Sequence, residues 1–85
     1  NEKKRFYDFF STNDIKFIPS QTNFILLPLG DASVRLRDGL LEEGIIVRLL
    51  RFRGKGIIRI TIGLPEENTL LMEKFMGVYE AAMVQ

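Results

Sequence analysis

The chain has 85 residues and a net charge of +1, with 46% hydrophobic and 27% charged residues, which predicts one globular domain with a modest core. The absence of cysteine and histidine excludes disulfides, thiolate chemistry, imidazole catalysis and nearly every transition-metal site, so no metal is expected. No apolar run approaches the roughly 20 residues of a membrane helix, so we expect a soluble, cytoplasmic protein without a membrane partner.

The amino-terminal segment predicts an amphipathic helix that ends near Ser11. Phe6, Phe9 and Phe10 have the i, i+3, i+4 spacing that places three rings on one helical face. The polar residues from Ser11 to Asp14 then break this pattern. We therefore expect the rings to pack in the core.

A strand and a second helix are predicted next. The apolar run favours a strand from about Asn23 to Leu29, because prolines restrict the backbone on both sides of it. Asp31 is a good N-cap residue for the helix in "ASVRLRDGLLEE", and Gly44 is placed to end that helix as its C′ glycine.

The second half of the chain predicts two strands and a third helix. "GIIVR" is expected to be a short buried strand and "LLRFRGKG" a loop or ribbon with glycines at its tip. In the strand Ile57–Gly63, isoleucines alternate with Arg59 and Thr61, so Arg59 should point away from the isoleucines. Pro65 fits the first position of a helix whose apolar residues keep a 3.6-residue period.

The order helix, strand, helix, strand, strand, helix predicts an α+β fold. We expect a small mixed, mainly antiparallel sheet with the helices on one face, because each amphipathic element must bury its apolar side against another layer. The uncovered face should carry Arg59, Thr61 and either Asn23 or Ile25, depending on register.

The charges are segregated along the chain. No acidic residue lies between Glu43 and Glu66, and this interval holds five cations: Arg48, Arg51, Arg53, Lys55 and Arg59. A local positive field of this kind indicates a small anion or an acidic surface as partner. Long nucleic acid generally needs a broader basic face, so we expect no nucleic-acid partner.

Three segments, "PSQTNFILLPL", "LLEEGIIVR" and "IIRITIGLPEEN", together resemble the small carboxy-terminal domain of class I/II pyridoxal-phosphate aminotransferases. The branch they resemble most is histidinol-phosphate aminotransferase, and the resemblance covers nearly the whole chain. The third segment is the most specific, because its strand and its Pro-Glu-Glu-Asn sequence occur together at a fixed spacing.

This resemblance implies roles for three residues. Arg59 matches the arginine that binds the substrate α-carboxylate, and Arg48 matches the arginine associated with the substrate phosphate. Asn23 matches the asparagine that begins the first strand, and a direct contact with the ligand is less expected of it. A planar guanidinium suits such anions because it offers two parallel donors. No catalytic and no cofactor-binding residue is assigned to this chain.

The resemblance also implies that residues 1–85 form a single domain that lacks the large, cofactor-binding domain. The parent enzyme would use pyridoxal 5′-phosphate to transfer an amino group from histidinol phosphate to 2-oxoglutarate in histidine biosynthesis. The lysines of this chain lack the serine-lysine sequence of the cofactor helix. The chain alone is therefore expected to bind no cofactor and to be inactive, and to pair as a homodimer through its exposed sheet.

Two alternatives stay open. A threonine-phosphate decarboxylase resembles the same branch and would use the same two arginines. A free-standing module could instead bind an anion or nucleic acid through the basic segment from Arg48 to Arg59, although Phe52 is the only aromatic residue there that could stack on a base.

Overall fold

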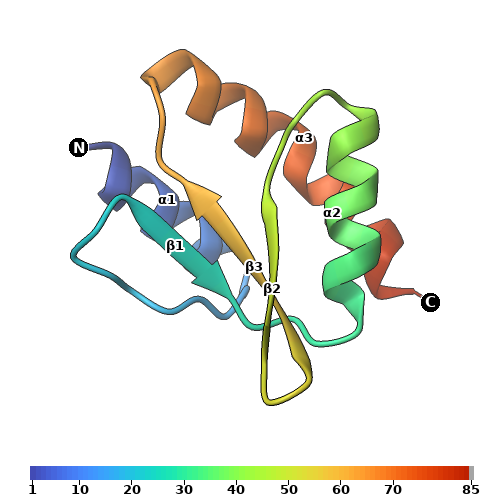
Figure 1. The fold of residues 1–85 in the computed structure, drawn as a ribbon. Coiled ribbons are helices and arrows are strands. Elements are labelled where there is room, and N and C mark those ends of the chain that lie inside the picture. Colours follow the sequence, from blue (N-terminus) through green and yellow to red (C-terminus); the bar gives the residue numbers. More distant parts are fainter. Residues whose placement is uncertain (85) are drawn as a thin grey trace.

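The computed structural model describes residues 1–84, so Gln85 of the expected domain lies outside the described residues. Figure 1 shows the arrangement of the elements. The helices are α1 (Glu2–Thr12), α2 (Ala32–Glu42) and α3 (Pro65–Met83), and the strands are β1 (Phe24–Leu27), β2 (Arg48–Phe52) and β3 (Lys55–Thr61). The predicted element order and the α+β class are confirmed.

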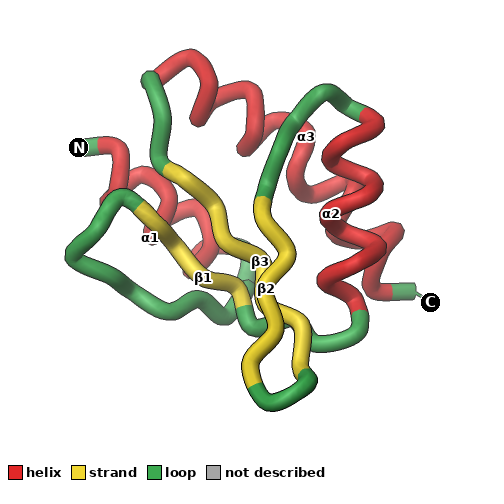
Figure 2. Tube along the Cα trace, in the orientation of Figure 1, coloured by secondary structure: helices red, strands yellow, loops and turns green. Residues whose placement is uncertain are grey.

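The strands form one sheet in the order β1-β3-β2 (Figure 2). Both strand pairs are antiparallel. The sheet expected to be mixed and mainly antiparallel therefore contains no parallel pair within residues 1–84. β3 lies in the centre, because β2 reaches it by a tight hairpin and β1 pairs with its other edge. Each residue near the middle of β3 has one neighbour on β1 and one on β2.

The hairpin between β2 and β3 turns at Arg53 and Gly54. Both have positive φ, 53° and 80°, while Phe52 pairs with Lys55 across the turn. Two-residue turns with positive φ match the right-handed twist of antiparallel strands, and glycine at the second position adopts this conformation without a steric penalty. Of the two expectations for "LLRFRGKG", the ribbon is confirmed.

The expected strand in "GIIVR" is misplaced. Ile45 and Val47 are buried, but they precede β2, which begins at Arg48 and is largely exposed. Their burial comes from contact with the core rather than from strand pairing. The hairpin turn sets the register of β2, and this register reaches only as far back as Arg48, opposite Arg59.

The end of α2 follows the prediction. Gly44 has φ 81° and donates its N–H to Leu41 O at 2.9 Å, while Ile45 N–H donates to Leu40 O at 2.9 Å. This pair of bonds satisfies two of the last helical carbonyls, and glycine suits the left-handed position. Buried Ile45 then leads the chain back to the core.

The helix starts agree with the prediction only in part. Pro65 is the first residue of α3, as expected, and the Glu67 carboxylate accepts the N–H of Leu64 at 2.8 Å. Asp31 immediately precedes α2, but its side chain makes no capping hydrogen bond. The reason is its helical backbone, φ −62° and ψ −28°, because N-cap side chains reach back from an extended conformation.

One face of the sheet packs on the helices. Ile25, Ile58 and Ile60 share a buried cluster with residues of α1, α2 and α3, including the rings of Phe6, Phe10 and Phe75. Helices α1 and α3 lie behind the strands in Figure 1. The helices thus cover a single face, as predicted. Among residues 1–84, no helix combines the length and apolar character that crossing a membrane requires.

Candidate functional site

The face of the sheet that carries no helix in the described part of the chain, called the open face below, is centred on Arg59. In the strand register, Arg59 pairs with Leu26 of β1 on one side and with Arg48 of β2 on the other. Its neighbours Ile58 and Ile60 are fully buried on the opposite face. The prediction that Arg59 points away from the isoleucines is therefore confirmed.

The register changes the expected composition of this face. Ile25 is buried in the core, whereas Phe24 pairs with Thr61 and shares the open face with Leu26 and Arg59. The expectation for Ile25 is wrong because alternation along β1 places every second residue outward, beginning with Phe24. Asn23 is exposed just before β1, where its carbonyl accepts the N–H of Ile62 at 2.8 Å.

Arg59 is held by an aromatic ring rather than by an acidic partner. Its Cζ lies 4.2 Å from the centroid of the Phe24 ring, a cation–π contact. Its Nε is shielded from solvent and has no hydrogen-bond partner among residues 1–84. A buried N–H without an acceptor is unfavourable by about 1–3 kcal/mol, and the terminal N–H groups of the guanidinium are the donors that remain accessible to a ligand.

Arg48 completes a pair of cations on the open face. It is exposed and lies directly across the strands from Arg59. The ion pairs of residues 1–84 involve other cations: Lys4, Arg5, Arg37 and Lys74. Like charges directly opposite one another in a sheet are unfavourable. An anion placed between or above the two guanidinium groups would remove this repulsion and take charge-assisted hydrogen bonds.

The other cations of the basic segment do not join this pair. Arg51 and Lys55 are exposed strand residues of the β2–β3 ribbon. Alternation directs Arg51 away from the open face. Lys55 precedes Arg59 by four residues on β3, a separation of about 13 Å. Arg53 lies in the turn, 5.3 Å from the ring of Phe52.

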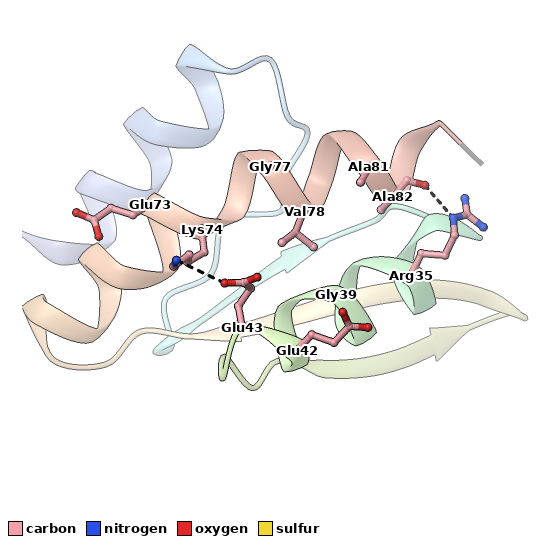
Figure 3. A pocket seen from close by; sticks show the side chains of 10 residues that line it. All are labelled: Arg35, Gly39, Glu42, Glu43, Glu73, Lys74, Gly77, Val78, Ala81 and Ala82. Atoms are coloured by element: carbon pink, nitrogen blue, oxygen red, sulfur yellow. Dashed lines mark hydrogen bonds and ion pairs between the residues drawn. The ribbon is translucent and has the colours of Figure 1, made fainter.

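Helices α2 and α3 border a separate groove of about 620 Å³ (Figure 3). The two cations among its lining residues have partners within the chain: Lys74 lies 3.5 Å from the carboxylate of Glu43, and Arg35 donates through Nε to Ala82 O at 2.8 Å. The groove belongs to the helical layer rather than to the open face. It does not bring the sequence-predicted residues together, so the open face remains the candidate site.

Metal chemistry has no support in the described part of the chain. No group of three or more carboxylate, histidine or cysteine side chains converges there. The open face offers guanidinium groups, which bind anions, together with apolar side chains. Of the residues at this site, Phe24 is the one that sequence reasoning missed. Strand alternation indicated that every second residue of β1 faces outward. Only the register showed that Phe24, rather than Ile25, is one of them.

Comparison with known proteins gives the family. The sequence model described as "Aminotransferase class I and II" matches residues 1–75. The chain is 42% identical over 74 residues to the histidinol-phosphate aminotransferase of Aliarcobacter butzleri, covering 85% of this chain and 20% of that protein. The corresponding enzyme of Campylobacter hominis is 41% identical over 75 residues, covering 86% and 20%.

A third relative agrees with these two. The histidinol-phosphate aminotransferase of Leptospira interrogans is 41% identical over 76 residues, which cover 86% of this chain and 20% of that protein. The chain thus spans about a fifth of the length of the curated relatives it matches. Because the family match extends over most of its residues, the chain belongs to the class I and II aminotransferase family.

Proposed function

We propose that this chain is the carboxy-terminal substrate-binding domain of a pyridoxal-phosphate-dependent histidinol-phosphate aminotransferase. The observation that carries the proposal is the pair of adjacent arginines on the open face, neither of which has an acidic partner among residues 1–84. The names of the relatives support the substrate class. The complete enzyme would move an amino group from histidinol phosphate to 2-oxoglutarate.

Arg59 is assigned the α-carboxylate of the amino-acid substrate. It lies on the central strand, where neighbours on both sides fix its backbone. A guanidinium is planar and always charged, so its edge can donate two parallel hydrogen bonds to a carboxylate. This interaction orients the substrate without itself moving a proton. Arg59 is accordingly a binding residue in the proposal.

Arg48 is assigned the phosphate of the phosphorylated substrate. Histidinol phosphate carries a phosphate ester and no carboxylate, whereas glutamate and 2-oxoglutarate carry carboxylates and no phosphate. A transaminase binds these partners in turn at one place. Two arginines side by side on adjacent strands could serve both anions in that place. Asn23 lies just outside β1, and its contribution remains a weaker proposal.

The cofactor would be held elsewhere in the complete enzyme, because the lysines of this chain do not fit it. Lys3 donates to Ser20 O at 2.7 Å, Lys4 pairs with Asp8 at 2.7 Å and Lys74 lies near Glu43. Lys16 and Lys55 are exposed. None lies in a dry pocket that would favour a reactive neutral amine. We therefore propose that the isolated chain does not catalyse amino transfer.

The open face would be covered in the complete enzyme by the large domain. It carries Leu26, Ile57 and Leu50 beside the arginines, and Leu50 is 38% exposed. Without that domain we propose that the isolated chain forms a homodimer through this face, because burying apolar surface contributes about 25 cal/mol per Å². Light scattering over a dilution series checks this, and a strictly monomeric species would contradict it.

The test uses the complete protein that carries this segment. Arg59→Ala should lower kcat/KM for glutamate about 30-fold or more, because it leaves a buried carboxylate without its charged partner. Arg48→Ala should lower kcat/KM for histidinol phosphate about 10-fold and leave glutamate within about 2-fold, because it removes a charge-assisted bond to phosphate alone. Arg53→Ala is the matched control and should change neither substrate by more than about 2-fold.

The outcomes separate the candidates. Unchanged kcat/KM for glutamate in Arg59→Ala would contradict the carboxylate role. Release of CO₂ from threonine phosphate, without amino transfer, would contradict the aminotransferase proposal and support the decarboxylase. Salt-dependent binding of an oligonucleotide that is lost in Arg48→Ala and Arg59→Ala would favour the binding module.

A further inference from the structure

The ring of Phe24 lies under the guanidinium of Arg59 on the open face. The two residues are diagonal neighbours on the open face, because Arg59 pairs with Leu26 and Phe24 lies two positions earlier on β1. Diagonal neighbours on one sheet face are within reach of an aromatic ring and a long side chain. The 4.2 Å separation of Arg59 Cζ from the ring centroid places the guanidinium over the ring.

This cation–π contact is the one directional interaction that the guanidinium of Arg59 makes within residues 1–84. No hydrogen bond or ion pair from another residue of the described part of the chain holds the guanidinium, and its Nε is enclosed without a partner. The ring therefore replaces the carboxylate that usually fixes an arginine. A carboxylate partner would neutralise the charge, whereas a ring orients the guanidinium and leaves its charge for a ligand.

The orientation matters for the ligand proposed above. An arginine side chain loses about 2 kcal/mol of rotamer freedom when it is fixed, and a pre-oriented guanidinium loses less of it on binding. The ring lies on one side of the guanidinium, and the terminal N–H groups stay available for two parallel bonds. The ring thus favours a planar carboxylate that approaches in the plane of the guanidinium.

We propose that Phe24 is a positioning residue that orients Arg59 for the substrate carboxylate. This inference rests on the proposed carboxylate role of Arg59. Phe24 touches the arginine rather than the reacting atoms, so it acts on affinity through Arg59. Phe24 and Arg59 are far apart in the sequence, and the register of β1 against β3 brings them together.

The first experiment reads the contact itself in the complete protein that carries this segment. With ¹⁵N-labelled arginine, the Nε–H signal of Arg59 should be shifted by the ring current and protected from exchange with water. Phe24→Leu should move the signal to the position of a free arginine, and Phe24→Tyr should leave it in place. Phe52→Leu is the matched control, which should move the signal of Arg53 but not that of Arg59. An unmoved Arg59 signal in Phe24→Leu would overturn the proposal.

The second experiment measures the consequence in the complete protein, with glutarate as a non-reacting dicarboxylate probe. Phe24→Leu should raise the inhibition constant of glutarate about 3- to 10-fold, while Phe24→Tyr and Phe52→Leu stay within about 2-fold. Phe24→Leu should add nothing in an Arg59→Ala background, because the effect passes through that arginine. An equal, additive effect in that background would overturn the positioning role.

Two controls keep the outcomes distinct. The thermal unfolding midpoint of each variant is measured, and Phe24→Met replaces Phe24→Leu if the leucine variant unfolds. If Arg59→Ala leaves the glutarate constant unchanged, the proposed function fails. The labelled-arginine experiment then still decides whether Phe24 orients Arg59.

Discussion

Two arginines of the β2–β3 hairpin each lie near a phenylalanine ring, and they differ in what holds them there. Arg59 sits in the middle of the central strand, 4.2 Å from the ring of Phe24 on another strand. Arg53 lies in the hairpin turn, 5.3 Å from the ring of Phe52, its own neighbour in sequence. Phe52 is 62% exposed, whereas Phe24 is half-buried.

The difference shows that a cation–π contact is informative only when tertiary structure enforces it. Arg53 and Phe52 lie close together because they are neighbours in sequence at a turn, and water screens the charge of the exposed arginine. Residues brought together by strand register keep one relative position, and partial burial strengthens their attraction. Only the Arg59 pair can therefore serve as a fixed binding element.

The largest effect we expect concerns the glycines of these two regions. A Cβ on Gly56 would meet the carbonyl oxygen of Gly30 at 2.6 Å and Ser33 Cβ at 2.9 Å, whereas a Cβ on Gly54 meets nothing within 4 Å. Gly56→Ala should therefore lower the free energy of unfolding by about 1–3 kcal/mol through overpacking. Chemical denaturation of this chain measures it.

Gly54 tests the turn by the same measurement. Its φ of 80° makes alanine strained there, so Gly54→Ala should lower the free energy of unfolding by about 1 kcal/mol. Asparagine tolerates this conformation, so Gly54→Asn should recover part of the loss, whereas Gly56→Asn should not. If asparagine recovered the free energy of unfolding equally at both positions, the close packing of Gly56 against Gly30 and Ser33 would be contradicted.

The next effect sharpens the contrast between the arginines. Arg59→Lys keeps the charge but loses the planar group that lies over the ring of Phe24 and can donate two parallel bonds. In the complete protein we expect kcat/KM for glutamate to fall about 10-fold, a partial retention compared with Arg59→Ala. Arg53→Lys should leave it unchanged. Full activity in Arg59→Lys would indicate that only charge matters at this position.

The smallest effect concerns Arg5, an arginine that does have an acidic partner. The pKa of Glu2 lies below its ordinary value of 4.5, mainly because Asn68 donates a hydrogen bond to its carboxylate, with Arg5 adding a second bond and its charge. Partial desolvation acts in the opposite direction. The folded state therefore favours the ionised carboxylate.

The sign of the pH dependence follows. A carboxyl group whose pKa is lower in the folded state stabilises the fold above its unfolded value, and this contribution disappears as the pH falls through the folded value. The stability difference between the native chain and Glu2→Gln should therefore shrink between about pH 5 and pH 3. Thermal unfolding at a series of pH values measures it. A difference that grows as the pH falls would contradict the assignment.

Local features of the fold were predictable because short-range chemistry controls them. The spacing of Phe6 and Phe10 indicated the buried side of α1, and Gly44 and Pro65 indicated where helices end and begin. The failures were also physical. Ile45 and Val47 looked like a buried strand, yet they pack on the core as irregular chain. The β2 residues that pair with β3 lie in the exposed, arginine-rich segment that follows.

The candidate site divides in the same way. Alternation in the sequence was enough to turn Arg59 away from the isoleucines, and the motif around it was enough to indicate the aminotransferase family. Neither could show that Arg48 lies directly opposite Arg59 or that Phe24 rather than Ile25 shares its face. Those facts depend on which residue of one strand meets which residue of another.

By itself, then, the sequence determined the helices, the turn at Gly54 and the outward direction of Arg59, since helix periods, turn conformations and strand alternation are properties of neighbouring residues. Only the tertiary structure decided which partners Arg59 has. Strand register is a long-range property, set here by the hairpin turn and by the packing of Ile25, Ile58 and Ile60 against the helices. A shift of one residue would have reversed the faces of β1 and buried Phe24 in place of Ile25.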